Sequence, residues 1–409
     1  MKIYLRPRPI FDDKASLETP LLNLYARYPS VCKYFESFQS SIDVEKDYVC
    51  ARKFLLARCV EPNTFPNYRN YIERILLWSW IYAEKSPLAL SVNDIRDFVS
   101  FNEHPANDWV GSCPRQRFTD NEGYIDFNDA WRPMRNRRSK AMGNCIKIDD
   151  EDDSTFQCVT SVSCMVQLLS ACSSFYNYMI EIGVGKSNPA ALLSKRYANR
   201  LRSTKKNRPS LTHEQWALVV DTAETMAQCD PRYERSLFII MVTYYLYLRG
   251  ADLASFNENT PCMSSFFERD DCWWFELPGR SKSQIISVDP EFIPYLVRYR
   301  ESRNLSPLPS PGDSDPLLVT VHGRPGLTDR QIRKIVQNIF DLTLLKMVRS
   351  GSSDEQCTSL RAASLAWLRE TGAMNAAQFR DLRHLQRDLR YASLAYTMDR
   401  YYSKGTEQL

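Results

Sequence analysis

Apolar residues recur at helical spacing through most of the first half of the chain. Between residues 44 and 83 they return every three or four positions, which is the period of one helix face. The same period returns in residues 91–101 and 162–182. Ser91 followed by Asp94 is typical of a helix N-terminus. We therefore expect an all-helical domain in this half.

Two segments lack this period. Residues 104–155 are rich in Pro, Asn, Asp and Gly and contain an acidic run, Asp149 to Asp153, and a basic cluster. Charge runs of this kind are usually solvated, so we expect a loop insertion here. Residues 1–45 contain several prolines and show no mechanism. We expect them to form an N-terminal arm, an accessory segment or a packing segment.

The second half combines helices with one pair of strands. Residues 237–248 are apolar on nearly all sides, which predicts a buried helix at the centre of a domain. Two β-prone runs, 273–277 and 284–288, are joined by a turn containing Pro and Gly. The pattern predicts a mainly α fold with a small β-hairpin or sheet in the C-terminal domain, preceded by an all-α N-terminal domain.

The last helices have candidate boundaries. Arg361 is expected early in a helix that Gly372 ends, because glycine often follows a helix C-terminus. Asn375 is expected to cap the next helix, whose apolar face leaves His384 outside.

Length and composition limit the classes of protein. A chain of 409 residues exceeds what one core normally serves. We expect an accessory segment at 1–45, a helical domain at 46–194, a basic linker at 195–210 and a C-terminal domain at 211–409. The 44% hydrophobic and 25% charged residues fit a globular protein. The net charge of +4 permits a nucleic-acid partner without requiring one.

Cysteine usage and the apolar runs bear on metals and on location. The sequence has twelve cysteines without a C-x-x-C pair, and only four histidines, which argues against a structural zinc site. The N-terminus has no apolar signal-peptide core. The longest apolar run, 237–248, is shorter than the roughly 20 residues that span a bilayer. We expect a cytoplasmic protein with no metal, no cofactor and no membrane contact.

The linker is strongly basic and contains no acid. Its basic residues are Lys195, Arg196, Arg200, Arg202, Lys205, Lys206 and Arg208. One interpretation is a solvated tether. The other is a tether that also neutralises DNA phosphates.

Candidate chemistry lies in the C-terminal domain. Arg249 ends the apolar run within Tyr247-Leu-Arg-Gly-Ala-Asp252, and Lys282 lies in the predicted hairpin turn. Thr358-Ser-Leu-Arg361, His384 and the pair Tyr401-Tyr402 follow later. Arginines have permanently charged planar forks that suit phosphate, and a tyrosine can form a phosphotyrosyl link.

In this order the residues resemble the tyrosine recombinases, the class of phage integrases and Xer-type enzymes. The resemblance covers residues 211–409 and, more weakly, the helical domain, which is similar to the family's core-binding, DNA-clamping domain. It implies a catalytic set of Arg249, Lys282, Arg361, His384 and Tyr401. The step from Arg361 to His384 has the family's spacing.

The sequence departs from the family pattern at two places. Thr358 stands where the family has histidine, and a hydroxyl is not an efficient base. Tyr401 lies further from His384 than is usual, so the other candidate nucleophiles stay open. They are Tyr402, Tyr396 and Tyr391.

The resemblance implies a site-specific recombinase that cleaves and rejoins double-stranded DNA through a 3′-phosphotyrosyl intermediate. It also implies a homotetramer on two DNA sites, bacterial and nucleoid-associated, with no small-molecule substrate. Two alternatives stay open, and only the first uses the same residues for catalysis. One is a type IB-like topoisomerase, and the other is a non-catalytic DNA-binding protein that keeps the fold. Convergence of Arg249, Arg361, His384 and Lys282 on one basic cleft is the corresponding structural expectation.

Overall fold

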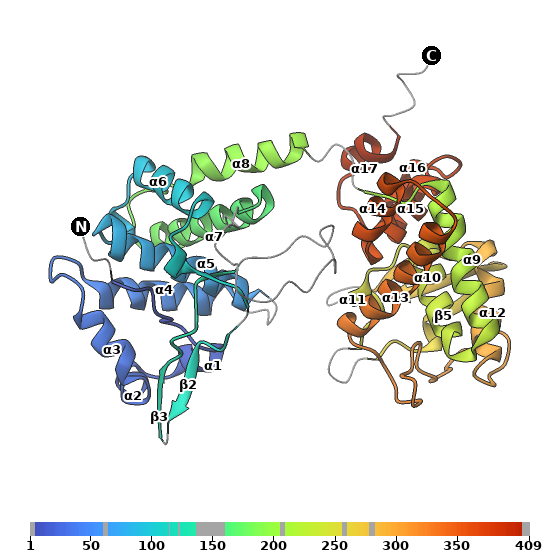
Figure 1. Ribbon diagram of the computed structural model, residues 1–409, viewed down its shortest axis with the longest axis horizontal. Coiled ribbons are helices and arrows are strands. Elements are labelled where there is room, and N and C mark those ends of the chain that lie inside the picture. Colours follow the sequence, from blue (N-terminus) through green and yellow to red (C-terminus); the bar gives the residue numbers. More distant parts are fainter. Residues whose placement is uncertain are drawn as a thin grey trace, which may run out of the picture. The chain divides into compact units, whose positions relative to one another are not determined.

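The computed structural model of the protein describes two compact units, one formed before residue 205 and one after residue 208 (Figure 1). The residues that it describes are 5–59, 64–113, 115–121, 123–135, 160–204, 209–255, 260–277 and 283–402. Each unit has its own hydrophobic core. Helices dominate and strands are short, which confirms the predicted mainly α fold. Within the described part, no helix is both long enough and apolar enough to cross a membrane.

The first unit is built around packed helices. They are α1 (Lys14–Glu18), α2 (Leu21–Arg27), α3 (Pro29–Glu36), α4 (Val44–Arg58), α5 (Phe65–Trp78), α6 (Val92–Glu103), α7 (Val162–Glu181) and α8 (Ala191–Thr204). A π-helical turn, Ser79–Ala83, extends α5. Helices α4, α5 and α7 contact one another, and Phe54 of α4 is buried against the rings of Tyr68 and Phe175. The apolar period of the sequence therefore marks the faces that form this core.

The described part of residues 1–45 packs into this core. Ile10 and Phe11 are buried, and their backbone N–H groups donate to Oε1 of Glu73 at 2.7 and 3.3 Å. Glu73 is itself buried in α5, and its other oxygen pairs with Arg117. One buried carboxylate therefore joins three separate stretches of the chain.

The described part of the 104–155 segment contains short strands where a loop was expected. Strand β1 (Val110–Gly111) pairs in parallel with β4 (Met134–Arg135). Strand β2 (Phe118–Asn121) pairs antiparallel with β3 (Tyr124–Phe127). These strands have two to four residues, too few for an alternating pattern to be read. Residues 136–155 lie outside the described residues.

The linker expected from residue 195 is helical up to Thr204, which corrects its predicted start. Helix α8 packs against α7 and directs Leu193 and Tyr197, one turn apart, towards the core. The dense basic residues concealed this short apolar stripe in the sequence. Residues 205–208 lie outside the described part.

The second unit surrounds one apolar helix. Its helices are α9 (His213–Cys229), α10 (Glu234–Tyr245), α11 (Gly250–Leu253), α12 (Ile293–Glu301), α13 (Asp329–Arg349), α14 (Asp354–Ala362), α15 (Leu365–Ala376), α16 (Leu382–Leu389) and α17 (Leu394–Tyr401). Helix α10 contacts α9, α12, α13 and α15, so it is enclosed on several sides. This confirms the buried helix predicted from the apolar run 237–248, except that the helix ends at Tyr245 and the last three residues of the run lie in the turn that follows.

The sheet of this unit has three antiparallel strands in the order β5 (Phe266–Arg269), β6 (Cys272–Leu277) and β7 (Gln284–Ser287). Phe275 of β6 lies opposite Phe266 on one side and Ile286 on the other, and all three are buried. The predicted hairpin is confirmed as β6–β7, and β5 adds a strand that the sequence did not predict.

Three expectations about the last helices were wrong. Gly372 lies inside α15, Arg361 lies in the last turn of α14, and Asp381 instead of Asn375 caps α16. A Cβ on Gly372 would lie 2.0 Å from the carbonyl oxygen of Tyr244. This glycine therefore permits a close crossing of α10 and α15 and does not end a helix.

Candidate active site

Arg249 lies in a tight turn between α10 and α11. Tyr247 has a left-handed backbone with a φ of 54°. The backbone N–H of Arg249 donates to the Asp252 carboxylate at 2.7 Å, and the Arg249 side chain is exposed. A Cβ on Gly250 would lie 2.2 Å from Asp329 and 2.9 Å from Leu365. The turn therefore packs closely against α13 and α15, which fixes the position of the Arg249 backbone.

A second arginine lies beside this turn. Arg390 follows α16 with a φ of 58°, and its Nη2 donates to Asp252 at 2.6 Å. Burial lowers the pKa of the Arg390 guanidinium, and the charges of Arg369 and Arg249 act in the same direction, while Asp252 opposes them. Two of its buried nitrogens, Nε and Nη1, have no hydrogen-bond partner among the described residues.

Arg361 and Thr358 lie one turn apart on α14. Ser353 caps this helix, and Cys357 and Leu360 are buried beneath it. Thr358 is exposed and Arg361 is half-buried. Leu365, the first residue of the next helix, α15, is the residue that packs against Gly250 beside Arg249.

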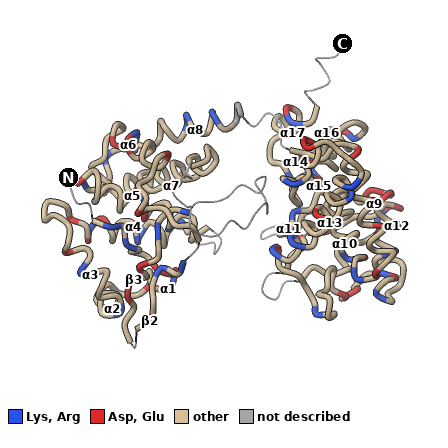
Figure 2. The backbone as a smooth tube through the Cα atoms, in the orientation of Figure 1, with Lys and Arg blue, Asp and Glu red and all other residues tan. Residues whose placement is uncertain are grey.

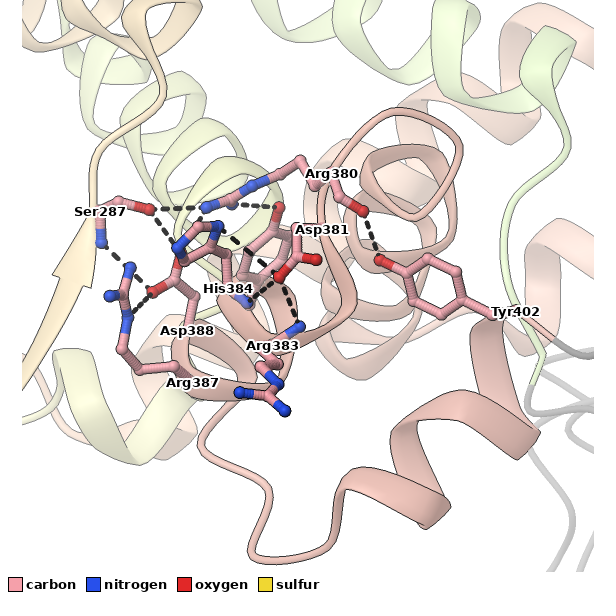
Figure 3. Close-up of polar contacts among 9 residues, drawn as sticks. Ser287, Arg380, Asp381, Arg383, His384, Arg387, Asp388 and Tyr402 are labelled. Carbon is pink, nitrogen blue, oxygen red and sulfur yellow. Dashed lines mark hydrogen bonds and ion pairs between the residues drawn. The ribbon is translucent and has the colours of Figure 1, made fainter.

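The candidate tyrosines separate into two groups. Tyr391, Tyr396 and Tyr401 form one aromatic cluster, with ring centroids 5.2 Å apart for Tyr391–Tyr396 and 6.4 Å apart for Tyr391–Tyr401. The hydroxyl oxygens of Tyr391 and Tyr401 are 3.4 Å apart. Tyr402 points elsewhere, because its hydroxyl donates to the carbonyl oxygen of Arg380 at 2.6 Å (Figure 3).

Two adjacent charged residues of α15 hold the tyrosine cluster. Arg369 donates to the carbonyl oxygens of Tyr247 and Leu389, and its Nη1 lies 3.4 Å from the Tyr391 hydroxyl. Glu370 accepts a 3.2 Å hydrogen bond from the Tyr401 hydroxyl and also pairs with Arg400. Arg369 thus joins the turn before Arg249 to the tyrosine cluster.

The electrostatic environments of the two paired tyrosines are opposite. Burial and the Glu370 carboxylate raise the pKa of Tyr401. Burial alone would raise the pKa of Tyr391, but the Arg369 charge and the hydrogen bond with Tyr401 outweigh it and lower that pKa. Tyr401 therefore donates its hydroxyl proton to the Glu370 carboxylate, and Tyr391 is the more acidic of the two phenols.

His384 lies in the first turn of α16. Its side chain is 64% exposed, and Nδ1 lies 3.7 Å from the carboxylate of the capping residue Asp381. Further along the same helix, the fully buried Asp388 binds Ser287 of β7 and Arg380 (Figure 3). This buried network fixes α16 against the sheet, while the histidine remains at the surface.

The basic residues of α8 form a separate candidate surface on the first unit. Lys195, Arg196 and Arg200 belong to this helix, and Figure 2 shows basic positions along α8. Arg196 and Arg200 line an open pocket of about 590 Å³ together with Arg96 of α6. The side chain of Arg202, and Lys205, Lys206, Arg208 and Lys282 altogether, lie outside the described residues.

Sequence reasoning missed several polar residues around the tyrosines. They are Arg369, Glu370, Arg380, Asp388, Arg390 and Arg400. The adjacent pair Arg369-Glu370 had a readable signal, because it interrupts an otherwise apolar stretch. Two adjacent charges that become buried usually have partners. Among the described residues, no cluster of His, Cys, Asp and Glu could hold a metal ion.

Comparisons with known proteins were made for the whole chain. No protein-family model and no curated protein matches the sequence. The solved structure of the XerH site-specific recombinase bound to difH substrate is similar over 94% of this chain and 88% of its own, with 13% identity and a TM-score of 0.50. The Tn1549 transposon integrase in complex with transposon right end DNA is similar over 87% of this chain and 94% of its own, with 11% identity and a TM-score of 0.52. The chain therefore has the fold of the tyrosine recombinases.

Proposed function

We propose that the protein is a site-specific DNA recombinase that cleaves and rejoins strands through a covalent 3′-phosphotyrosyl intermediate. The observation that carries this proposal is the junction at Arg369. This residue binds both the turn that precedes Arg249 and the phenol of Tyr391, which lies beside Tyr401. A phosphate-binding arginine and a candidate nucleophile thus belong to one packed assembly on the recombinase fold.

Tyr401 is the proposed nucleophile. The Arg400 guanidinium lies over its ring, and its neighbour Tyr391 contacts Arg369, whereas the Tyr402 hydroxyl is bound to a backbone carbonyl. Attack by the phenolate forms the bond from Tyr401 to phosphorus and releases the 5′ oxygen. The phosphodiester energy is then kept for resealing.

Arg249 and Arg361 are proposed to bind the non-bridging oxygens, where negative charge increases during attack. His384 would donate to the same phosphate, and its exposed ring is accessible to DNA. Lys282 would protonate the departing 5′ oxygen. Thr358 would contribute a hydrogen bond only, because a threonine hydroxyl is a poor base. Side-chain cations and a phenol suffice for these steps, so the proposal includes no cofactor.

The DNA partner is proposed to contact both units. Helix α8 would neutralise backbone phosphates through Lys195, Arg196 and Arg200. Recombination between two duplexes requires cleavage of four strands, so we propose a homotetramer on two DNA sites.

A covalent trap tests the proposal. The protein is incubated with nicked duplexes of randomised sequence, denatured and separated on a gel, and the DNA bound to protein is sequenced. We expect an adduct on one recurring sequence, with none from Tyr401→Phe and a normal yield from Tyr402→Phe. An adduct that persists in Tyr401→Phe would assign the nucleophile to another tyrosine. Failure of the wild-type protein to form any adduct would refute the proposed chemistry and favour a DNA-binding protein without catalysis.

The same preparation distinguishes recombination from relaxation. Supercoiled plasmids with and without the recovered sequence are incubated with the protein. Relaxation that is equal on both plasmids would favour a topoisomerase. We expect recombination of the plasmid that carries two copies of the site.

A further inference from the structure

The buried carboxylate of Glu370 points at the hydroxyl of Tyr401. Glu370 is 4% exposed and lies in the middle of α15. Its Oε2 accepts the 3.2 Å hydrogen bond from Tyr401, and its Oε1 is bound by Arg400. We infer that Glu370 is a catalytic base, which takes the phenolic proton of Tyr401 as the tyrosine attacks the phosphate. This inference rests on the proposed function.

A base is needed because Tyr401 does not ionise readily by itself. Burial and the nearby carboxylate raise its pKa, so the free phenolate is scarce at neutral pH. The proton must then leave as the bond to phosphorus forms, and the acceptor must already be within hydrogen-bond reach. The Glu370 carboxylate meets this requirement.

Other candidate acceptors fit less well. The Tyr391 oxygen lies 3.4 Å from Tyr401, but it is bound by the Arg369 cation, which makes it a weak proton acceptor. Thr358 is exposed and has only a hydroxyl. His384 faces Asp381 on the first turn of α16. Glu370 thus supplies a base where Thr358 cannot.

Arg400 has a positioning role. It lies in the last turn of α17, immediately before Tyr401, and binds the carboxylate oxygen that Tyr401 does not use. The carboxylate is therefore held with one oxygen towards the phenol, and the two partners approach it from the same helix. A side chain held by packing and by a hydrogen bond loses little orientational freedom when it reacts.

The step balances in atoms and protons. The Tyr401 O–H bond breaks, its proton passes to Oε2 of Glu370, and the phenolic oxygen bonds to phosphorus. The bond from phosphorus to the 5′ oxygen breaks, and that oxygen takes a proton from the acid proposed above, Lys282. Resealing reverses both transfers, so Glu370 ends as a carboxylate.

The expected pH dependence follows from the groups that face the carboxylate. They are Arg400 and Tyr401 of α17, Tyr391 of the preceding segment, and Arg369, which acts through Tyr391. A protonated carboxyl group cannot accept the phenolic proton. The rate of adduct formation should therefore fall on the acidic side, in proportion to the remaining carboxylate.

The test measures the rate of adduct formation against pH on the duplex recovered from the randomised library. Glu370→Gln should lower the rate by about 10²–10⁴-fold and remove the acidic fall. Glu370→Asp keeps a carboxylate, so it should give an intermediate rate and keep the acidic fall. Glu234→Gln is the matched control, because it removes another carboxylate bound to an arginine in the same unit. It should leave both the rate and the pH profile unchanged.

A second substrate separates the base from the leaving-group acid. Sulfur replaces the 5′ oxygen at the cleaved bond, and a thiolate leaves without being protonated. The defect of Glu370→Gln should persist on this substrate. Rescue by sulfur would assign Glu370 to the leaving group and overturn the inference.

The remaining outcomes are also decisive. If wild-type protein forms the adduct and Glu370→Gln matches or exceeds its rate, the inference fails and the proposed function stands. If Glu370→Asp loses the acidic fall while remaining folded by its melting temperature, the inference also fails. If the wild-type protein forms no adduct, the proposed function fails and the inference with it.

Discussion

Arg369 donates a 2.7 Å hydrogen bond from Nε to the carbonyl oxygen of Tyr247. Its Nη2 donates to the carbonyl oxygen of Leu389 at 2.8 Å. One buried guanidinium therefore satisfies the backbone at the end of two segments, one that precedes Arg249 and one that precedes Tyr391. We therefore expect the geometry of the candidate site to depend on these two hydrogen bonds more than on any single surface residue.

Replacement of Arg369 by methionine should destabilise the second unit. Methionine keeps the apolar stem but removes the donor to the Leu389 carbonyl and the shorter of the two hydrogen bonds to the Tyr247 carbonyl, which keeps only the 3.4 Å contact from Arg390. We therefore expect a loss of about 3 kcal/mol in the free energy of unfolding. Urea unfolding monitored by circular dichroism measures it. Arg298→Met is the control, because its guanidinium is 33% exposed and pairs with Glu234, and it should cost under about 1 kcal/mol. Equal losses of unfolding free energy in the two variants would show that Arg369 contributes no more than an ordinary surface ion pair.

Tyr391 should titrate below the usual range of tyrosine. The Arg369 charge stabilises its phenolate, so the phenolate signal of wild type minus Tyr391→Phe should develop below about pH 10. Absorbance at the phenolate band, recorded against pH, provides the measurement. Tyr402→Phe is the comparison, because burial raises the pKa of Tyr402 and its difference signal should develop at higher pH. A reversed order would contradict the assigned environments.

Alanine at Gly372 should destabilise the protein even though alanine favours helices. The new Cβ would lie 2.0 Å from the carbonyl oxygen of Tyr244, so α10 and α15 would have to separate. We expect a loss of roughly 2 kcal/mol or more, typical of overpacking. Ala366→Gly, at an exposed position of the same helix, should cost only about 1 kcal/mol from helix propensity. A neutral or stabilising Gly372→Ala would mean that the crossing is looser than described.

Because of Asp47, the first unit should lose stability as the pH rises from 4 to 6. Burial raises the pKa of this carboxyl to about 6, although Ser86 and Trp80 donate hydrogen bonds to it. The folded protein therefore binds a proton in this window that the unfolded chain has already released, and stability falls as the pH rises. Asp47→Asn should remove a decline on the order of 2 kcal/mol. Thermal unfolding at successive pH values tests it, and an unchanged slope in the variant would refute the assignment.

Histidine at position 358 should accelerate strand cleavage. Thr358 is exposed one turn before Arg361, and an imidazole there can exchange protons at neutral pH. We expect about a tenfold or greater gain in the rate of adduct formation on a nicked duplex. Thr358→Asn, which adds polar bulk without a titrating group, should give no comparable gain. If histidine gives none either, position 358 does not limit the reaction.

The sequence predicted most of the helical framework because the apolar period is strong. The cap predicted at Ser91 is present, and the apolar run yields the central helix α10 of the second unit. Strand β5 was missed because its four residues carry too little pattern. Gly372 was misread because its role depends on the neighbouring α10, which no local pattern reveals.

The candidate site was predictable only where the residues match a known order. Arg249, Arg361 and Tyr401 could be selected from the sequence. The interrupted apolar stretch indicates that Glu370 is buried, but it does not reveal the contact with Tyr401, which depends on how α15 and α17 pack.

The contact of Glu73 with Ile10 and Phe11 limits where the chain can be shortened. A fragment that begins at Val44, the first residue of α4, would retain every residue of α4, α5 and α7. It would nevertheless lose the backbone N–H groups of Ile10 and Phe11, which donate to the buried carboxylate of Glu73. A crystallographer or biochemist who wants the first unit alone should therefore begin the fragment before Ile10.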